Sequence, residues 1–487
     1  MRKKITIDPI TRLEGHGKIS IFLNDAGDVD EAFFQVPEYR GFEKFCESRA
    51  AEEMPALTQK ICGVCPTAHH MASTKALDAV FNVEPPPAAK KVRELIYNAF
   101  MFEDHLLHFY FLGGPDFIVG PKAPKAERNI IGVLGKVGIE VGKKVIDIRK
   151  RVRQLNATLS GSSLYPIFGL PGGISKGINE EQRNTMKQVG VDALEFAKFT
   201  LKTFDELVLK KKEYLDLIIG DIYSHKTYYM GLVDENNRLN FYDGKIRVVD
   251  EDGAEFAKFS PKEYLEHLEE ATVPWSYMKV LYLKNVGWKG FVDGADNGIY
   301  RVAPLARLNV SESMPTPLAQ AQYERMYDTF GCRPVHNTLA YHWARLIEVL
   351  YAAERMNELL NDPEITSTHI RNIPDDTPSE GVGVCEAPRG TLFHHYQTDS
   401  KGIIRKVNLL VATQNNAAAI CMSIKKAARS LIKNGQVSDG ILNMIEMAFR
   451  AYDPCLACAT HSLPGEMPLS VDIYNHDREV IRQIKRE

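Results

Sequence analysis

The chain has 487 residues, of which 44% are hydrophobic and 25% are charged, and its formal net charge is -3. This length allows a large buried core, and the composition is that of an ordinary globular protein. The nearly balanced charge argues against a nucleic-acid-binding surface as the main function. No apolar run is long enough to span a membrane, and no apolar stretch follows the basic N-terminus. We therefore expect a cytoplasmic protein without a membrane span or a nucleic-acid partner.

The first 60 residues are predicted to be β-rich. Residues 4–36 alternate apolar and polar side chains around a turn at residues 24–27, which is the pattern of a small antiparallel sheet. Residues 61–219 are predicted to form a first helical half, because the segments between 87 and 212 carry apolar residues at helical spacing.

The remainder of the chain is predicted to contain an insertion and a second helical half. Residues 220–312 are polar, aromatic and rich in turn residues, as in short strands and hairpins. Residues 313–461 return to helical spacing at 315–361 and at 415–452. Residues 462–487 form a short C-terminal extension. The predicted fold class is therefore mainly α with smaller β regions, that is, α+β.

Four of the eight cysteines form two C-x-x-C pairs, Cys62-Gly-Val-Cys65 and Cys455-Leu-Ala-Cys458. We expect no disulfide framework in a cytosolic chain of this size. A tight turn points both thiolates of such a pair at one ion, and four thiolates suit zinc, an iron–sulfur cluster or another soft metal. A lone pair is also compatible with a thioredoxin-like redox function. The spacing alone leaves these alternatives open.

The surroundings of the two pairs argue against a structural zinc site. The pairs lie at opposite ends of a long chain, whereas structural zinc usually staples local segments. Histidines and an acid flank them, namely His69 and His70 near the first pair and Asp453 and His461 near the second. Ionisable groups next to thiolates can move protons as well as help to bind a metal, which favours a catalytic site.

Six sequence blocks, in order along nearly the whole chain, resemble those of the large subunits of nickel–iron hydrogenases. They are DPITRLEGHGKI, EYRGFEKF, KICGVCPTAHH, EDHLLHFYFLGGPD, CEAPRGTLFHHY and DPCLACATH. The third block departs at Lys60, where many members have arginine, which leaves the local ion pairing open. The resemblance implies a central bundle of long helices with a small N-terminal sheet and an inserted β-rich region. It also implies reversible heterolytic cleavage of H2 to protons and electrons.

The resemblance implies a nickel–iron centre. Four cysteines would hold nickel: Cys62, Cys65, Cys455 and Cys458. Cys65 and Cys458 would also bridge to an iron that carries one carbon monoxide and two cyanide ligands. Glu43 and His461 would bind a magnesium ion together with a main-chain carbonyl near Asn416. Magnesium prefers oxygen ligands, which suits Glu43, whereas the histidine ligand rests on the resemblance alone.

The same resemblance assigns roles to charged side chains near the centre. Glu14 would take the proton from a nickel-bound thiolate and start its path outward, because heterolytic cleavage needs a base close to the metal. Arg389 would lie over the open metal position, with Asp104 and Asp453 around it. Its permanent positive charge would then face the anionic, cyanide-bearing iron.

Two further side chains would contact the centre. Thr413 would help to hydrogen-bond a cyanide, and His69 would support a bridging sulfur. The residue types also allow plainer roles. Glu14 would then be a surface ion-pair partner, Arg389 a buried structural ion-pair member, and Asp453 a turn residue before a proline.

The other histidines and cysteines are expected to be structural or supporting residues. They are His105, His108, His394 and His395, together with Cys46, Cys332, Cys385 and Cys421 as buried small hydrophobes. Because these four cysteines form no iron–sulfur motif, the electrons need a separate carrier. We expect an obligate heteromer with a small subunit that carries the iron–sulfur clusters, and with further diaphorase or flavin-containing subunits.

The C-terminal sequence and the missing leader resemble the cytoplasmic, multi-subunit branch of the family. That branch includes enzymes linked to nicotinamide, to deazaflavin and to flavin-based electron bifurcation. No G-x-G-x-x-G follows a strand, so a dinucleotide would bind a partner subunit. The electrons are expected to reach NAD(P), ferredoxin or another soluble acceptor, with a nicotinamide- or bifurcation-linked complex favoured. The resemblance also implies that a protease removes residues 462–487, after His461.

Three rival hypotheses are open at this point. The quinone-side subunit of respiratory complex I shares the fold, but it resembles a hydrogenase that has lost its metal cysteines. A non-catalytic assembly subunit with structural zinc would contain zinc and no nickel. A thiol oxidoreductase would need one cysteine pair and would leave the second pair and His461 unexplained.

Overall fold

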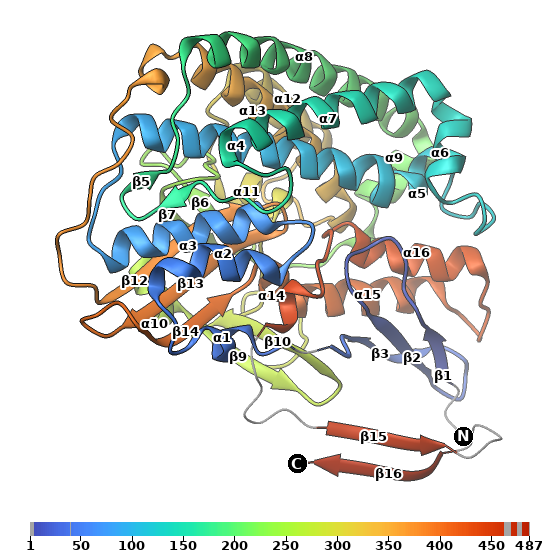
Figure 1. Ribbon diagram of the computed structural model, residues 1–487. Coiled ribbons are helices and arrows are strands. Elements are labelled where there is room, and N and C mark those ends of the chain that lie inside the picture. The colour runs from blue at the N-terminus through green and yellow to red at the C-terminus, as the bar shows by residue number, and fades with distance from the viewer. Residues whose placement is uncertain (1–3, 39, 462–468, 475–479, 487) are drawn as a thin grey trace.

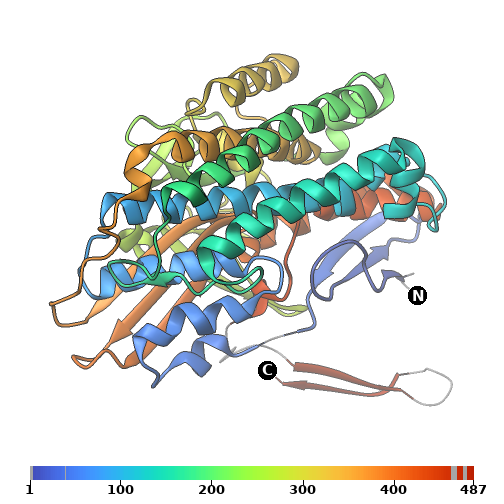
Figure 2. The same cartoon turned by 45° about the horizontal axis from the view of Figure 1, so that its top comes forward.

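Four long helices form a bundle in the computed structural model, which describes residues 4–38, 40–461, 469–474 and 480–486. They are α4 (Pro87–Leu107), α7 (Ile139–Ser160), α8 (Glu180–Phe204) and α13 (Tyr341–Asn361). Helices α13 and α7 each pack against α4 and α8, and the four lie side by side in both ribbon views (Figures 1 and 2). This is the predicted helical bundle.

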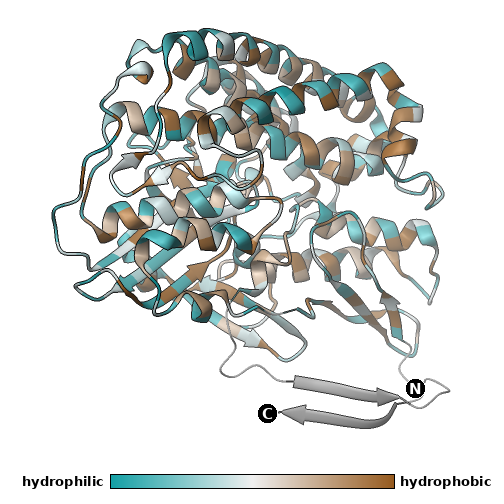
Figure 3. Ribbon diagram, in the orientation of Figure 1, coloured by the Kyte–Doolittle hydropathy of each residue, from teal (hydrophilic) through white to brown (hydrophobic). Residues whose placement is uncertain are grey.

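The burial of each helix follows its sequence. Helix α13 is buried on all sides, including the charged Arg345 and Glu348, as expected of a helix at the centre of a large core. Helices α7 and α8 mix hydrophilic and hydrophobic residues, and Figure 3 shows hydrophilic residues along the outer side of α8. Asn179 is the N-cap residue of α8, and its side chain accepts the amide of Gln182 at 2.8 Å in a capping box.

The N-terminal segment forms the predicted antiparallel sheet. Its strands, in spatial order, are β1 (Lys4–Ile7), β2 (Lys18–Leu23) and β3 (Val29–Gln35). Helix α15 (Ala417–Leu431) packs against β3 and against α16 (Asp439–Arg450). The loop between β1 and β2 thereby reaches the C-terminal half, where Glu14 and Cys455 form an isolated parallel bridge.

A second antiparallel sheet lies under α3 (Pro66–Val80) and was not predicted. Its strands are β12 (Glu380–Ala387), β13 (Gly390–Thr398) and β14 (Ile404–Leu410). Gly381 and Gly383 let α3 approach closely, since a Cβ at Gly383 would lie 2.1 Å from the carbonyl oxygen of Ala72. Both faces of β12 and β13 are largely buried, so their sequences lack the alternation that marks a half-exposed strand.

The region between the helical halves has the predicted β character. A four-stranded sheet contains β6 (Tyr228–Val233), β7 (Lys245–Val249), β8 (Glu255–Phe259) and β11 (Tyr300–Arg301), and β9 (Leu268–Val273) pairs with β10 (Ser276–Leu283). Apolar residues of these strands share a buried cluster with Val384, Phe393 and Leu410 of the sheet under α3. The inserted strands are therefore packed onto the second half of the chain.

Shorter elements complete the fold. The remaining helices are α1 (Phe42–Cys46), α2 (Met54–Thr58), α5 (Pro115–Ile118), α6 (Ile130–Val137), α9 (Lys212–Ile219), α10 (Tyr264–His267), α11 (Pro304–Val310), α12 (Pro317–Phe330) and α14 (Ala412–Asn415), and the remaining strands are β4 (Gly169–Leu170) and β5 (Gly173–Ile174). The fold is mainly helical with several small sheets, which confirms the predicted α+β class. Within the described residues, no helix has the length and apolar character needed to cross a membrane.

The C-terminal extension contains a hairpin of β15 (Leu469–Tyr474) and β16 (Val480–Arg486). The predicted cleavage point follows His461. The next residue, Ser462, lies outside the described residues.

Candidate metal centre

The two C-x-x-C pairs meet in the interior of the protein. The four Sγ atoms of Cys62, Cys65, Cys455 and Cys458 lie within 4.8 Å of one another, and all four residues are buried. The Sγ atoms are 3.3 Å apart in Cys62 and Cys455, 3.5 Å apart in Cys65 and Cys458, and 2.8 Å apart in Cys455 and Cys458. The predicted convergence of both pairs on one site is confirmed.

The first pair lies in the turn that leads into α3. Cys62 follows a 3-10 turn at Gln59–Ile61, and Cys65 is the N-cap residue of α3, which begins with Pro66. The backbone amides of Val64 and Cys65 donate to Sγ of Cys62 at 3.2 and 3.1 Å. These amides favour negative charge on that sulfur.

The second pair follows a tight turn after α16. Asp453 adopts a left-handed backbone conformation, with φ of 58°, and so turns the chain toward the cluster. The amide of Cys455 then donates to Oγ1 of Thr413 at 2.9 Å. Cys458 opens a further 3-10 turn, Cys458–Thr460. Together with the isolated parallel bridge between Glu14 and Cys455, these contacts determine where the two sulfurs lie.

Arg40 ties the two cysteine loops together and was not singled out by the sequence analysis. Its guanidinium donates to the main-chain carbonyls of Ile61 and Ala457, which directly adjoin one cysteine of each pair. Arg40 stands in the EYRGFEKF block, so its position could have drawn attention to it. Its role could not be predicted, because an arginine that binds main-chain carbonyls has no local sequence signature.

Burial governs the protonation of the sulfurs. Burial raises the pKa values of Cys455 and Cys458. Burial also opposes ionisation of Cys62, but hydrogen bonds from the other three cysteines bring its pKa below the usual value. A bound metal cation would supply the positive charge that four buried thiolates need. The all-sulfur donor set suits a soft transition metal.

Glu14 reaches the cluster from the loop between β1 and β2. Its Oε2 atom accepts a hydrogen bond from Sγ of Cys455 at 2.9 Å and another from the amide of Ala457 at 3.1 Å. Burial and the negative charge of Cys62 raise the pKa of Glu14. A half-buried carboxylate with a raised pKa, in contact with a cluster sulfur, can receive a proton from it.

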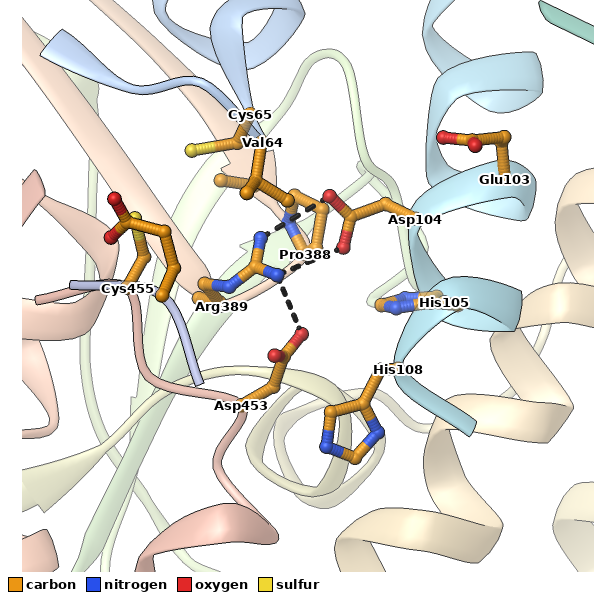
Figure 4. Close-up of polar contacts among 12 residues, drawn as sticks. Val64, Cys65, Glu103, Asp104, His105, His108, Pro388, Arg389, Asp453 and Cys455 are labelled. Atoms are coloured by element: carbon orange, nitrogen blue, oxygen red, sulfur yellow. Dashed lines mark hydrogen bonds and ion pairs between the residues drawn. The ribbon is translucent and has the colours of Figure 1, made fainter. Parts of the chain in front are cut away.

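Arg389 lies between two buried carboxylates (Figure 4). It occupies the turn between β12 and β13, and its Nη2 atom lies 2.9 Å from Oδ2 of Asp453 and 3.2 Å from Oδ1 of Asp104. Its Nη1 atom donates to the other oxygen of Asp104 at 3.2 Å. Burial opposes its charge, but Asp104, Asp453 and two cluster cysteines raise its pKa, so the guanidinium keeps its charge beside the sulfurs.

His69 begins a buried chain of hydrogen bonds. It lies in the first turn of α3, and its Nδ1 atom is 3.1 Å from Nε2 of His394. Nδ1 of His394 is 2.7 Å from Oη of Tyr396, which donates to Oγ of Ser73 at 2.8 Å. Burial lowers the pKa of His69 to about 4 and lowers that of His394 as well, so both rings are neutral. His394 therefore supports His69, as expected of a structural histidine.

Glu43 and His461 lie together, and Nε2 of His461 is 3.6 Å from Oε1 of Glu43. The same Nε2 atom is 2.6 Å from the carbonyl oxygen of Leu409, whose amide donates to Glu43 at 2.8 Å. The carbonyl of Asn416 instead accepts the amide of Ile420 within α15. The carbonyl that lies against this pair is that of Leu409, seven residues before Asn416, and the magnesium ligand set stays a prediction.

The two helix histidines bind protein groups. Nε2 of His105 is 2.8 Å from Oε2 of Glu348, and Nε2 of His108 is 2.9 Å from the carbonyl oxygen of Arg450. His395 is 2.9 Å from Oη of Tyr264. These histidines are structural, as predicted.

The expectation for the remaining cysteines is confirmed in part. Cys46, Cys385 and Cys421 are buried, but the prediction for Cys332 is wrong because this residue is exposed. It follows Gly331, the left-handed residue that ends α12, and so stands in a surface turn. Lys60, the departure in the third block, lies with Nζ 3.4 Å from the ring centroid of Tyr165.

Comparison with known proteins decides the family. The chain matches a family model described as nickel-dependent hydrogenase over residues 40–135 and 295–461, and a HoxL-like model over residues 4–39. A relative from Archaeoglobus profundus, described as an iron-sulfur subunit of an F420-non-reducing hydrogenase, is 48% identical over 484 residues, with 99% of each chain covered. The chain belongs to the nickel-dependent hydrogenase family.

Further comparisons extend this result to the three-dimensional structure. The NAD-reducing hydrogenase HoxS subunit beta from Cupriavidus necator is 36% identical over 490 residues, with 98% of each chain covered. A crystal structure of an NAD+-reducing NiFe-hydrogenase in the H2-reduced state has a TM-score of 0.87 and 35% identity, and covers 94% of this chain and 99% of that one. The hydrogenase chain is thus a catalytic subunit that acts on H2, and four of its eight cysteines form the metal site.

Proposed function

We propose that this hydrogenase subunit holds a nickel–iron centre whose iron carries one carbon monoxide and two cyanide ligands, and that Glu14 receives the proton released there. The contact that carries the proposal is the 2.9 Å hydrogen bond between Sγ of Cys455 and Oε2 of Glu14, at the edge of a cluster of four buried sulfurs. When bound, the metal centre supplies heterolytic cleavage of H2 and takes up the two electrons.

Glu14 is suited to accept a proton and pass it on. The heavy-atom distance to Cys455 lies within the range for direct proton transfer, which is roughly 2.6–3.2 Å. The pKa of Glu14 is raised toward neutral pH, so the carboxyl group can be protonated and deprotonated in turn during catalysis. The loop that carries Glu14 is partly exposed, which gives the proton a short way outward.

Arg389 and Thr413 would interact with the ligands of the iron. Arg389 would hold a fixed positive charge beside anionic ligands, because Asp104 and Asp453 orient it from both sides. Thr413 accepts the amide of Cys455 through Oγ1, which leaves its own hydroxyl hydrogen to donate to a cyanide. His69 would support a bridging sulfur from the first turn of α3.

We further propose a magnesium ion bound by Glu43, His461 and the carbonyl of Leu409. The close approach of these three groups supports the site, and burial raises the pKa of Glu43, as expected of a carboxylate without a full counter-charge. A Glu43→Gln change should lower magnesium content while nickel is retained. Glu380→Gln, at the exposed pair with His395, is the matched control. Equal magnesium in both variants would contradict this ligand set.

The electrons are proposed to leave through a small subunit with iron–sulfur clusters, followed by diaphorase or flavin-containing subunits. Within the described residues, the four cysteines are the one group of three or more Cys, His, Asp or Glu side chains close enough to hold a metal ion, so this part of the chain offers no side-chain ligand set for an iron–sulfur cluster of its own. One relative is described as NAD-reducing and another as F420-non-reducing. NAD(P) or ferredoxin is therefore the proposed acceptor, and a deazaflavin is not.

Two measurements on the complex from its native host test the proposal. An infrared spectrum should show one metal carbonyl band and two cyanide bands. Absence of these bands, together with zinc and no nickel, would favour a structural metal instead. H2-dependent reduction should then be measured separately with NAD+, ferredoxin and a deazaflavin. Reduction of the deazaflavin alone would overturn the proposed acceptor and leave the metal centre unaffected.

A further inference from the structure

The segment that carries Glu14 has no helix or strand of its own. Residues 8–17 form the loop between β1 and β2, yet the proposed proton transfer needs Glu14 within hydrogen-bonding distance of Cys455. The amide of Leu456 donates to the carbonyl of Glu14 at 3.0 Å. Gly15 has φ of 86°, and a Cβ there would lie 2.9 Å from the amide nitrogen of Ala457. The loop thus lies directly against the second cysteine loop.

One buried carboxylate connects both loops to the helical body. Oδ1 of Asp116, in the short helix α5, is 2.5 Å from Nη2 of Arg12, and Oδ2 is 2.6 Å from Nη1 of Arg450. Arg12 stands two residues before Glu14, and Arg450 stands five residues before Cys455. The two carboxylate oxygens of Asp116 therefore hold the segment that carries Glu14 and the segment that leads to Cys455.

Further contacts close this arrangement, which we call the Asp116 cluster (Arg12, Asp116, Asn443, Glu446 and Arg450). Oε2 of Glu446 accepts Arg450 at 2.5 Å and also accepts Oγ1 of Thr11 at 2.9 Å. Nδ2 of Asn443 donates to Asp116 at 3.0 Å. Two arginines face two carboxylates, so the cluster is neutral as a whole and depends on every member.

The backbone of Arg12 shows that its placement is specific. Arg12 adopts a left-handed conformation with φ of 60°, which costs energy for a residue other than glycine. Its Nη1 atom also donates to the carbonyl of Leu112 at 2.9 Å. Burial opposes the charge of Asp116, but Arg450 and Arg12 keep its pKa below the usual value, so it stays ionised between them.

We infer that Asp116 is a positioning residue for proton transfer, which acts through Arg12 and Arg450 to set the distance between the Glu14 carboxylate and the Cys455 sulfur. The inference rests on the proposed role of Glu14. Without the charge of Asp116, Arg12 and Arg450 would repel each other, and the loop of Glu14 would lose its fixed point. A shift of about 1 Å at such a contact can lower a rate by about a hundredfold.

The test compares two reactions of the metal-loaded heteromeric enzyme. Conversion of para-H2 to ortho-H2 needs reversible cleavage at the metal centre, whereas exchange of D2 with solvent protons also needs the proton to leave. In Asp116→Asn, solvent exchange should fall by about tenfold to a hundredfold while para–ortho conversion stays within about twofold of the wild type. Arg12→Lys keeps the positive charge but loses the forked contact, and it should show the same selective loss of solvent exchange. This variant replaces Asp116→Asn in the test if Asp116→Asn does not assemble into the complex.

A matched control separates positioning from stability. Asp78, which is partly buried, forms a comparable pair with the buried Arg93, at 2.5 and 3.2 Å. Asp78→Asn should lower thermal stability without changing the ratio of the two rates. A readout that is independent of turnover is the infrared C=O band of protonated Glu14, assigned by its loss in Glu14→Gln, which should shift in Asp116→Asn and Arg12→Lys.

The outcomes for the two proposals differ. If Glu14→Gln keeps solvent exchange, the proton-accepting role of Glu14 fails and the inference fails with it. If Glu14→Gln loses exchange, but Arg12→Lys and Asp116→Asn keep both the wild-type ratio and the band position, then Asp116 is purely structural and the inference alone is overturned.

Discussion

Glu14 and Cys455 are separated by 441 residues in the chain, yet the carboxylate of one accepts a hydrogen bond from the sulfur of the other at 2.9 Å. The loop after the first strand and the loop after α16 meet along a parallel backbone bridge at these same two residues. The fold therefore holds the proton acceptor and the sulfur as a pair. A change in the length of the Glu14 side chain tests whether their direct contact is needed.

Shortening this side chain should slow proton transfer without removing the carboxylate. In Glu14→Asp the carboxylate is withdrawn by one methylene, so the direct contact with Cys455 is lost and H2 oxidation should fall by about tenfold or more. Glu14→Gln cannot accept a proton and should be slower still. The rates should be measured with metal content verified for each variant. An Asp variant as fast as the wild type would show that direct contact between the carboxylate and the sulfur is not needed.

The positive charge of Arg389 should not be enough for catalysis without the forked geometry of its guanidinium. Its guanidinium contacts Asp104 through two nitrogens and Asp453 through one of them, which a lysine ammonium cannot reproduce. Arg389→Lys should lower turnover by roughly a hundredfold, the scale seen when one electrostatic donor is removed from an active site. Arg355→Lys is a control, because Arg355 makes a similar forked contact with Glu94 outside the site. Comparable losses in the two variants would argue for a general folding defect.

The metal ligands were predictable and their supports were not, for a physical reason. The spacing of the cysteine pairs predicts a metal site, and the resemblance of two further sequence blocks to the family implies the roles of Glu14 and Arg389. Asp116 and Arg40 act on residues far away in the chain, and their partners are identified by the fold alone. The sheet of β12–β14 escaped prediction because burial on both faces removes the alternation of polar and apolar residues.

A buried histidine should make the first helical half sensitive to acid. His70 is fully enclosed: its Nδ1 is 3.1 Å from the carbonyl of Pro55, and its Nε2 accepts the amide of Gly169 at 2.9 Å. The bond from Gly169 requires the neutral ring, because a protonated Nε2 cannot accept, and burial lowers the pKa of His70 to about 4. Because the folded pKa lies below the unfolded value of about 6.5, this contribution to stability is complete above pH 6.5 and is lost as the pH falls toward 4. It amounts to about 3 kcal/mol.

The measurement is the melting temperature of the wild type and of His70→Gln from pH 7 to pH 4.5. A glutamine can donate to one partner and accept from the other without titrating, so the variant should lose less stability over this range. His16→Gln is the control, since His16 has a side chain that is 75% exposed. Parallel melting curves for the wild type and His70→Gln would show that His70 does not titrate in this window.

The proposed removal of residues 462–487 can be argued from the position of His461. This residue is fully buried, with Nδ1 2.9 Å from the carbonyl of Cys458 and Nε2 2.6 Å from that of Leu409. His461 thus lies buried next to Cys458, and cleavage after it would place the new C-terminus beside the metal site. We expect the active enzyme to contain a subunit that is shorter by the 26 residues after His461. Intact mass spectrometry of the active complex measures this directly, with the unprocessed chain as the mass reference. A full-length mass in fully active enzyme would mean that the extension stays in place.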